Sequence, residues 1–121
     1  MQKRILTVDD SKTMRDMLLV TLKKAGYDVV QAEDGQDGLT KLTDGGADVI
    51  ITDINMPVMN GIEFIKACRA RVDYASTPIL TLTTESSDAK KDEGRNAGAT
   101  GWIVKPFNPE KLLRIVEKVC P

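Results

Sequence analysis

Acidic, hydroxyl and amine side chains follow short apolar runs at four places in this sequence. Asp9 and Asp10 come directly after the first run, and Asp53 follows the third. Thr83 closes the fourth run, and Lys105 follows the fifth. In an open parallel sheet, ligands bind at the carboxyl ends of the strands, where the strand order reverses. Parallel strands at these runs would therefore bring the five side chains together.

The three carboxylates of this set favour a hard divalent cation. Two unit charges 4 Å apart repel by about 4 kcal/mol at an effective dielectric constant of about 20. The sequence has no histidine, so the ligands on offer are oxygens, which suit Mg²⁺. Ca²⁺ needs more protein oxygens, and no D-x-D-x-D-G loop is present. We therefore predict a Mg²⁺ site at Asp9, Asp10 and Asp53.

Asp53 is the predicted nucleophile, because it stands at the centre of the expected sheet. A carboxylate can attack a phosphoryl group and form an aspartyl phosphate. Lys105 would bind one phosphoryl oxygen, and the Thr83 hydroxyl would donate to another after transfer. Asp10 is the expected direct metal ligand and Asp9 the expected water-mediated one, although strand geometry alone does not order these two acids.

Each of these residues also has an ordinary structural explanation. An Asp-Asp pair after a strand often forms a turn or a helix cap. A threonine at a strand end reflects β-propensity, and a single lysine is usually a solvated surface charge. The agreement of four separate strand ends favours a functional site.

Short runs rich in β-branched residues alternate with longer segments of helical periodicity. Strands are predicted over residues 4–8, 28–32, 48–52, 79–83 and 102–104. Helices are predicted between Ser11 and Gly26, over residues 35–42, around residues 62–68, over residues 87–97 and from Pro109 onward. The strands are apolar on both faces, as in a parallel sheet covered on both sides. We predict a doubly wound, flavodoxin-like α/β fold with five parallel strands in the order 2-1-3-4-5.

Two helices carry specific expectations about burial. The first should turn an apolar stripe that includes Met17 toward the core. The helix over residues 87–97 is highly charged and has only Ala89 and Ala97 to bury. It also contains Gly94, which costs a helix interior roughly 1 kcal/mol. This helix is either an ordinary solvated element or a weakly held one that a small event can shift.

Composition restricts the class of protein further. Apolar residues make up 41% of the sequence, and the net charge is −1. The sequence has no long basic patch, so a nucleic-acid partner is not expected. The apolar runs fall far short of the roughly 20 residues that span a bilayer. We expect a cytoplasmic monomer with a single domain over residues 1–121 and no output domain. Cys68 and Cys120 are expected to be free thiols, and the lack of histidine excludes Ser-His-Asp and Cys-His nucleophiles.

The sequence resembles the receiver domain of bacterial response regulators over essentially its whole length. The resemblance rests on motifs in the order and spacing of that family, namely Val8–Ser11, Asp53–Pro57, Gly61, Thr83 and Lys105–Phe107. Further stretches are most similar to the stand-alone chemotaxis members of the family, namely Met14–Arg15, Ala32–Gly35, Glu85 and Gly98–Trp102.

The resemblance implies two-component signalling, in which Asp53 accepts a phosphoryl group from the phosphohistidine of a histidine kinase. It implies that Asp10, Asp53 and the backbone carbonyl of Asn55 bind Mg²⁺, with Asp9 assisting through water. Such a protein is regulatory rather than an enzyme, and it catalyses its own phosphotransfer and dephosphorylation.

The resemblance also implies roles for residues around the phosphoryl group. Thr83 and Lys105 would bind that group, and the Lys105–Pro106 peptide bond would be cis. Asn55 and Glu85 each lie two residues after a site residue, so they could orient or screen an attacking water and tune dephosphorylation.

The resemblance further implies a switch and its partners. The phosphodonor would be a chemotaxis histidine kinase, and a phosphatase could act on the product. The target would be the flagellar motor switch, bound through the face formed by the fourth helix, fifth strand and last helix. Trp102 stands where the family usually has Tyr or Phe, so it is either a plain core aromatic or a switch that moves with Thr83.

Three other functions compete with this one. A phosphate sink for a kinase shared with other regulators would use the same chemistry. A haloacid-dehalogenase-type phosphohydrolase also uses an aspartate nucleophile, but it needs a second aspartate where this chain has Asn55. In a flavodoxin-like FMN module, Asp9 and Asp10 would repel the flavin phosphate.

Overall fold

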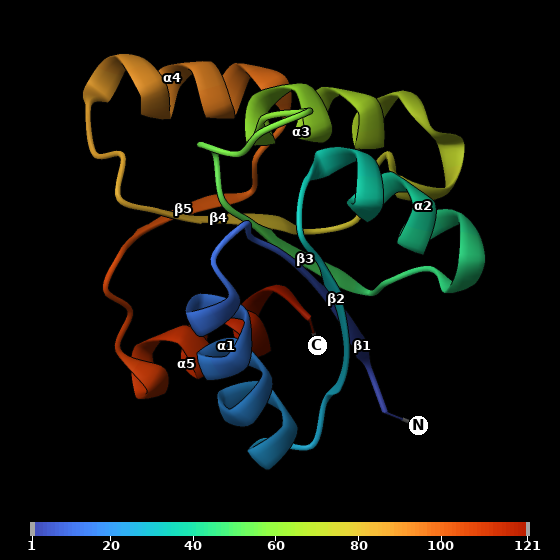
Figure 1. Cartoon of the computed structure of the whole chain (residues 1–121), viewed down its shortest axis with the longest axis vertical. Helices are drawn as coiled ribbons and strands as arrows, with labels where there is room; N and C mark the ends of the chain where they lie inside the picture. Colours follow the sequence, from blue (N-terminus) through green and yellow to red (C-terminus); the bar gives the residue numbers. More distant parts are fainter. Residues whose placement is uncertain (1, 121) are drawn as a thin grey trace.

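The computed structural model describes residues 2–120, which form five strands that alternate with helices (Figure 1). The elements in chain order are β1 (Arg4–Val8), α1 (Lys12–Lys24), β2 (Asp28–Ala32), α2 (Gly35–Gly45), β3 (Val49–Thr52), α3 (Gly61–Ala70), a short 3₁₀ helix η1 (Val72–Tyr74), β4 (Ile79–Thr83), α4 (Asp88–Ala97), β5 (Gly101–Val104) and α5 (Pro109–Val119).

The five strands form one parallel sheet in the order β2-β1-β3-β4-β5, which confirms the predicted topology. The order reverses between β1 and β3, where Val8 stands opposite Thr52 in the register. Both strands therefore end at the same level, and the residues that follow them, Asp9 and Asp53, emerge side by side. The doubly wound fold thus creates the crevice in which such sheets bind ligands.

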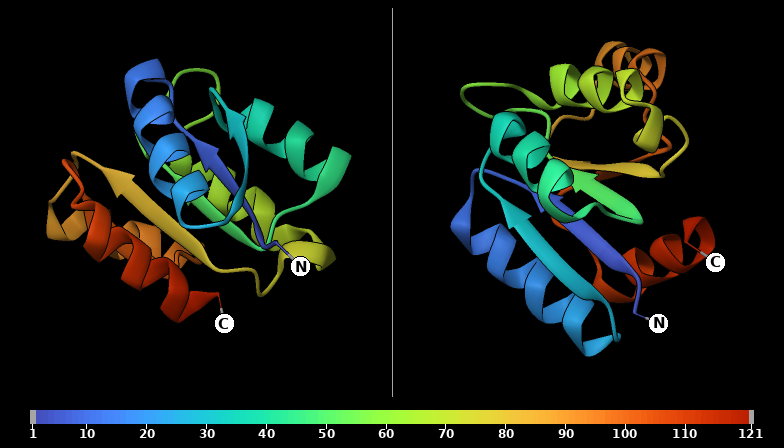
Figure 2. Two further views of the ribbon diagram at one scale, coloured as in Figure 1. Left: turned by 90° about the horizontal axis from the view of Figure 1, so that it is seen from below. Right: turned by 90° about the vertical axis from the view of Figure 1, so that its right-hand side faces the viewer.

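Helices cover both faces of the sheet, as the two views of Figure 2 show. The helices α2, α3 and α4 lie on one face, and α1 and α5 lie on the other. Each face has its own core, with Phe64 and Ile65 at the centre of the first and Leu18 and Leu112 in the second. The central strands β3 and β4 are buried along their whole length, and their residues are aliphatic apart from three buried threonines, Thr52, Thr81 and Thr83.

Side-chain caps determine where the helices begin. The Ser11 hydroxyl accepts a hydrogen bond from the N–H of Met14, and Asn60 forms a capping box with Glu63. Ser87 is the cap of α4 rather than its first residue, so that helix begins one residue later than predicted. The helix α2 extends three residues beyond the predicted end at residue 42, to Gly45.

Two predictions about burial are wrong. Met17 is 47% exposed, because it lies about 100° around α1 from the buried Leu18 and so points past the edge of the core. Ala89 is exposed, whereas Gly94 of the same helix is buried along with Ala97. In residues 2–120, no helix is both long enough and apolar enough to cross a membrane.

Candidate functional site

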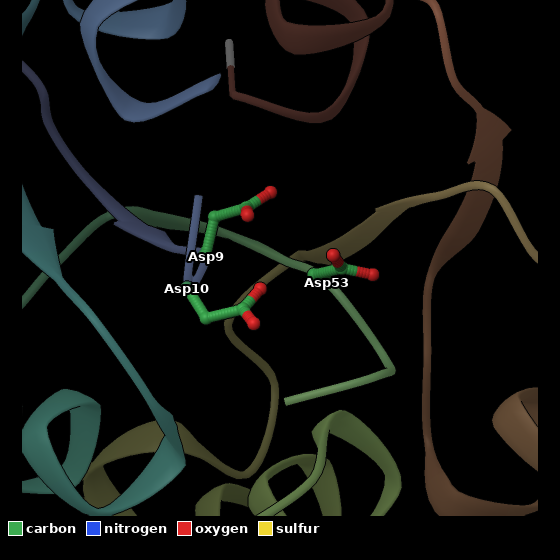
Figure 3. Close-up of side chains that lie close together, drawn as sticks. All are labelled: Asp9, Asp10 and Asp53. Carbon is green, nitrogen blue, oxygen red and sulfur yellow. The ribbon is translucent and has the colours of Figure 1, made fainter. Parts of the chain in front are cut away.

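Three carboxylates meet at the carboxyl ends of β1 and β3 (Figure 3). Asp9, Asp10 and Asp53 each offer an oxygen atom, and these oxygens all lie within 4.8 Å of one another. Asp9 is 1% exposed and Asp53 is 7% exposed, whereas Asp10 is open to solvent. The structure therefore brings together the three acids that the sequence places in the predicted metal site.

Backbone hydrogen bonds fix the two buried acids. The Asp9 carboxylate accepts from the N–H of Ser11 at 2.9 Å, and the Asp53 carboxylate accepts from the N–H of Ile54 at 2.6 Å. The Asp53 N–H in turn donates to the carbonyl of Val8 at 2.9 Å. Both carboxylates thus have one oxygen occupied by the backbone and a second oxygen available to a cation.

Lys105 takes up both of those second oxygens. Its Nζ lies 2.8 Å from Oδ2 of Asp9 and 3.0 Å from Oδ2 of Asp53. The lysine is held in turn, because its backbone N–H donates to the carbonyl of Thr83 at 2.8 Å. The following Lys105–Pro106 peptide bond is cis, the isomer that the family resemblance implies. One ammonium is therefore shared between two buried carboxylates.

The pKa values of Lys105 and Asp9 are both raised, but for different reasons. Burial would by itself lower the pKa of Lys105, but its hydrogen bonds to Asp9 and Asp53 outweigh burial and raise that pKa above the ordinary value. Burial raises the pKa of Asp9, and the contacts of that carboxylate with Lys105 and Ser11 offset the rise only in part. Lys105 therefore stays charged at neutral pH, and its single charge does not fully compensate the buried acids.

The site fits a divalent cation. Three carboxylates and one ammonium leave two formal negative charges unbalanced, the charge that one dication carries. Among residues 2–120, the exposed carboxylate of Asp10 has no hydrogen bond or salt bridge of its own, so its oxygens are available to a metal. An all-oxygen set open to water on one side suits Mg²⁺, which keeps several of its own waters.

Thr83 and Glu85 lie at the end of the neighbouring strand β4. The Thr83 side chain is fully buried, and its hydroxyl oxygen accepts from the N–H of Glu85 at 3.3 Å. Because the hydroxyl acts here as an acceptor, its hydrogen remains free for another oxygen. The side chain of Asn55 is exposed on the loop after β3.

Trp102 links the loop after β4 to α4. Its indole Nε1 donates to the backbone carbonyl of Glu85 at 2.9 Å. Its ring packs on Gly94, where an added Cβ would come within 2.6 Å of the indole Cζ3. This close packing explains a glycine inside α4 that sequence reasoning treated only as a cost.

Sequence reasoning missed a contact of Arg15 with the site. Its guanidinium donates to the backbone carbonyl of Asp9 at 2.7 Å, and this carbonyl belongs to the peptide that joins Asp9 to Asp10. The side chain of Gln31 donates to the carbonyl of Arg15 from the neighbouring strand β2. No local sequence signal reveals such a contact, because it depends on how α1 packs beside β2.

Comparison with known proteins identifies the family. The family model for the response regulator receiver domain matches residues 5–117, nearly the whole chain. The chain belongs to this family. The receiver is similar to chemotaxis protein CheY1 of Helicobacter pylori, with 44% identity over 119 residues that cover 96% of this chain and 95% of the relative. A chemotaxis protein CheY homolog of Campylobacter jejuni is 42% identical over 96% of this chain and 91% of its own length.

Solved structures agree with this assignment. The structure of chemotaxis protein CheY4 of Vibrio cholerae superimposes with a TM-score of 0.95 at 53% identity, covering 98% of this chain and 99% of that one. A putative response regulator of Chloroflexus aurantiacus reaches a TM-score of 0.94 at 32% identity, with 99% and 98% covered. The receiver is thus of the CheY type, a class of regulatory protein, and this is consistent with two-component signalling in chemotaxis.

Proposed function

We propose that this receiver accepts a phosphoryl group on Asp53 from the phosphohistidine of a chemotaxis histidine kinase. The observation that carries the proposal is the buried Asp53 carboxylate, held between Lys105 and the carboxylates of Asp9 and Asp10. The regulatory character of the family disfavours the two other functions considered, a phosphohydrolase and a flavin carrier.

In the proposed transfer, a carboxylate oxygen of Asp53 attacks the phosphorus atom and the P–N bond of the donor histidine breaks. The electron pair of that bond leaves with the imidazole nitrogen, which then takes a proton from solvent. Lys105 binds a phosphoryl oxygen and offsets the charge that gathers there. The buried hydroxyl of Thr83 donates to another phosphoryl oxygen once the group is in place.

Mg²⁺ is the proposed cofactor of this site. Asp10, Asp53 and the backbone carbonyl of Asn55 would hold the ion, and Asp9 would bind it through water. When bound, the ion neutralises phosphoryl oxygens and the acids around them. The chain itself provides the nucleophile and keeps the two buried carboxylates fixed by the backbone N–H groups of Ser11 and Ile54.

The same acceptor site can drive an output surface. We propose that phosphorylation draws Thr83 toward the phosphoryl group on Asp53 and that Trp102 then repacks against α4. The hydrogen bond from the indole to the Glu85 carbonyl would change with this repacking. The relatives are named chemotaxis proteins. We propose that the target is the flagellar motor switch, bound through the face formed by α4, β5 and α5. Amide exchange with and without beryllofluoride tests this, and an unchanged segment 85–102 would contradict it.

Two residues beside the phosphoryl group would set how long it persists. Asn55 and Glu85 flank the phosphoryl group and tune its hydrolysis, with or without a partner phosphatase. A phosphorylated form stable for many hours would contradict this.

We place the protein in the cytoplasm as a monomer, with residues 1–121 forming one domain that acts on other molecules. Pull-down with motor-switch peptides, with and without beryllofluoride, separates a motor regulator from a phosphate sink.

Intact mass spectrometry tests the central reaction. The protein is incubated with acetyl phosphate and Mg²⁺, which should add one phosphoryl group, about 80 Da. The Asp53→Asn variant should gain no mass, because it lacks the nucleophile. Removal of Mg²⁺ with EDTA should also abolish the gain in the wild-type protein. Equal labelling of the variant and the wild type would overturn the assignment of Asp53.

A further inference from the structure

Asp10 is the acid of the site whose own side chain does least to hold it in place. Its carboxylate is exposed, and among residues 2–120 it forms no hydrogen bond and no salt bridge. It nevertheless lies on the same side as the carboxylates of Asp9 and Asp53, with an oxygen atom within 4.8 Å of theirs (Figure 3). The position of this carboxylate therefore depends on the backbone before it, the peptide that joins Asp9 to Asp10.

Arg15 holds that peptide. Its guanidinium Nη1 donates to the carbonyl of Asp9 at 2.7 Å, and within the described part of the chain this carbonyl accepts no other hydrogen bond. The N–H of Asp9 donates to the carbonyl of Ala32 at 3.1 Å, which continues the pairing of β1 with β2. The sheet thus fixes the residue up to its N–H, and Arg15 fixes the direction of the carbonyl that leads on to Asp10.

Arg15 is itself held between α1 and β2. Its backbone N–H donates to the carbonyl of Ser11 at 3.0 Å, and its own carbonyl accepts from the side chain of Gln31 at 3.0 Å. The Arg15 side chain is half-buried, yet among residues 2–120 it forms no salt bridge with an acid. The contact that its guanidinium does make is with the backbone beside Asp10, so its geometry suits orientation of that backbone rather than neutralisation of an acid.

We propose that Arg15 is a positioning residue for the metal, because it fixes the Asp9–Asp10 peptide and so places the Asp10 carboxylate for Mg²⁺. This inference rests on the proposed function, in which Asp10 is a direct ligand. Groups that orient metal ligands typically contribute about 10- to 100-fold in metal affinity. The positive charge of Arg15 acts in the opposite direction, since it repels a second cation. Weaker Mg²⁺ binding without Arg15 therefore cannot be an effect of charge.

Three variants test this role. Arg15→Met removes the hydrogen bond and keeps an unbranched apolar stem, whereas Arg15→Lys keeps one donor. The matched control is Arg71→Met, which removes another half-buried guanidinium that donates to a backbone carbonyl, that of Leu39 at 3.3 Å. Arg71 lies far from the site, because α3 starts beside Asp53 and its ten residues extend about 15 Å before Arg71. Isothermal titration calorimetry gives the Kd for Mg²⁺ of each unphosphorylated protein.

Arg15→Met should raise the Kd for Mg²⁺ about tenfold, equivalent to about 1.4 kcal/mol. Arg15→Lys should bind Mg²⁺ more tightly than Arg15→Met, and Arg71→Met should match the wild type. At saturating Mg²⁺, acetyl phosphate should label Arg15→Met within about twofold of the wild-type rate, since the defect is one of affinity. An unchanged or lower Kd in Arg15→Met would overturn the inference. An equal rise in Arg71→Met, or no recovery in Arg15→Lys, would also overturn it.

Two further measurements separate this inference from its alternatives. The Tm of Arg15→Met in EDTA should lie within about 4 °C of the wild type, as for the loss of one hydrogen bond. A much larger drop would show that Arg15 supports the fold rather than the metal site. Asp10→Asn should lose most of its Mg²⁺ affinity. Wild-type protein that binds no Mg²⁺, or an Asp10→Asn variant that binds it equally well, would instead remove the proposed cofactor site itself.

Discussion

Replacement of Lys105 by methionine should strongly destabilise the metal-free protein. The substitution keeps an unbranched apolar stem but removes the ammonium that lies 2.8 Å from Asp9 and 3.0 Å from Asp53. Two buried carboxylates would then face each other without a compensating charge. Loss of one partner of a buried ion pair costs about 3–5 kcal/mol. Because Asp10 opens one side of the site to water, we expect the lower end, about 3 kcal/mol.

The assay is urea unfolding followed by the fluorescence of Trp102, at pH 7 and in EDTA. Mg²⁺ should restore most of the lost stability, since ligand at one hundred times its Kd adds about 2.7 kcal/mol. In the wild-type protein, the raised pKa of Lys105 means that its stabilising contribution is full below pH 10.5 and is lost as the pH rises through the folded-state value. The variant should therefore approach the wild type at strongly alkaline pH.

The matched control is Lys12→Met, which removes an exposed salt bridge to Asp16 on α1. Such pairs contribute roughly 0–1 kcal/mol, so this variant should unfold close to the wild type. If Lys105→Met unfolds within 1 kcal/mol of the wild type in EDTA at pH 7, then Lys105 does not compensate the buried acids, and the electrostatic description of the site is wrong.

Three further predictions follow from packing and burial. Gly94→Ala should displace the indole of Trp102, because the added Cβ would lie 2.6 Å from the ring. A red-shifted fluorescence maximum would report the displacement, and an unchanged spectrum would contradict the packing. Burial raises the pKa of Cys68 to about 11 from 9.0, so maleimide at pH 7 should label Cys120 and spare Cys68. Because the Cys68 thiol ionises more readily in the unfolded chain, the free energy of unfolding should fall as the pH rises from 9 toward 11. Labelling of both thiols at one rate in the native protein would be inconsistent with this. Thr7→Val should raise the free energy of unfolding by about 1 kcal/mol, because the buried Thr7 hydroxyl has no partner among the described residues; a destabilised variant in urea would show that it has one.

The strands could be predicted from the sequence because each apolar run is short, β-branched and followed by a polar residue. Thr83 ends β4 and Asp53 directly follows β3, as expected, and the strand order then brings Asp53 beside Asp9. The site could be predicted for the same reason, since the end of a parallel strand fixes where the next residue emerges. Helix ends were less certain, because α2 continues to Gly45 past the last residue of clear periodicity.

Other features depend on tertiary packing that no local pattern encodes. The contact of Arg15 with the Asp9 carbonyl needs α1 to lie at a particular angle over the sheet. The burial of Gly94 depends on an indole that arrives from β5. The positive φ of Val58 contradicts the preference of its residue type, so sequence reasoning could not predict it.

Borohydride reduction tests the central claim most directly, because it marks the phosphorylated residue itself. An aspartyl phosphate treated with borohydride becomes homoserine, which peptide mass spectrometry assigns to a position in the chain. Protein treated with acetyl phosphate and Mg²⁺ should contain homoserine at position 53, and protein treated in EDTA should contain none. Homoserine at position 9 or 10 in place of 53, or none in the presence of Mg²⁺, would contradict the account.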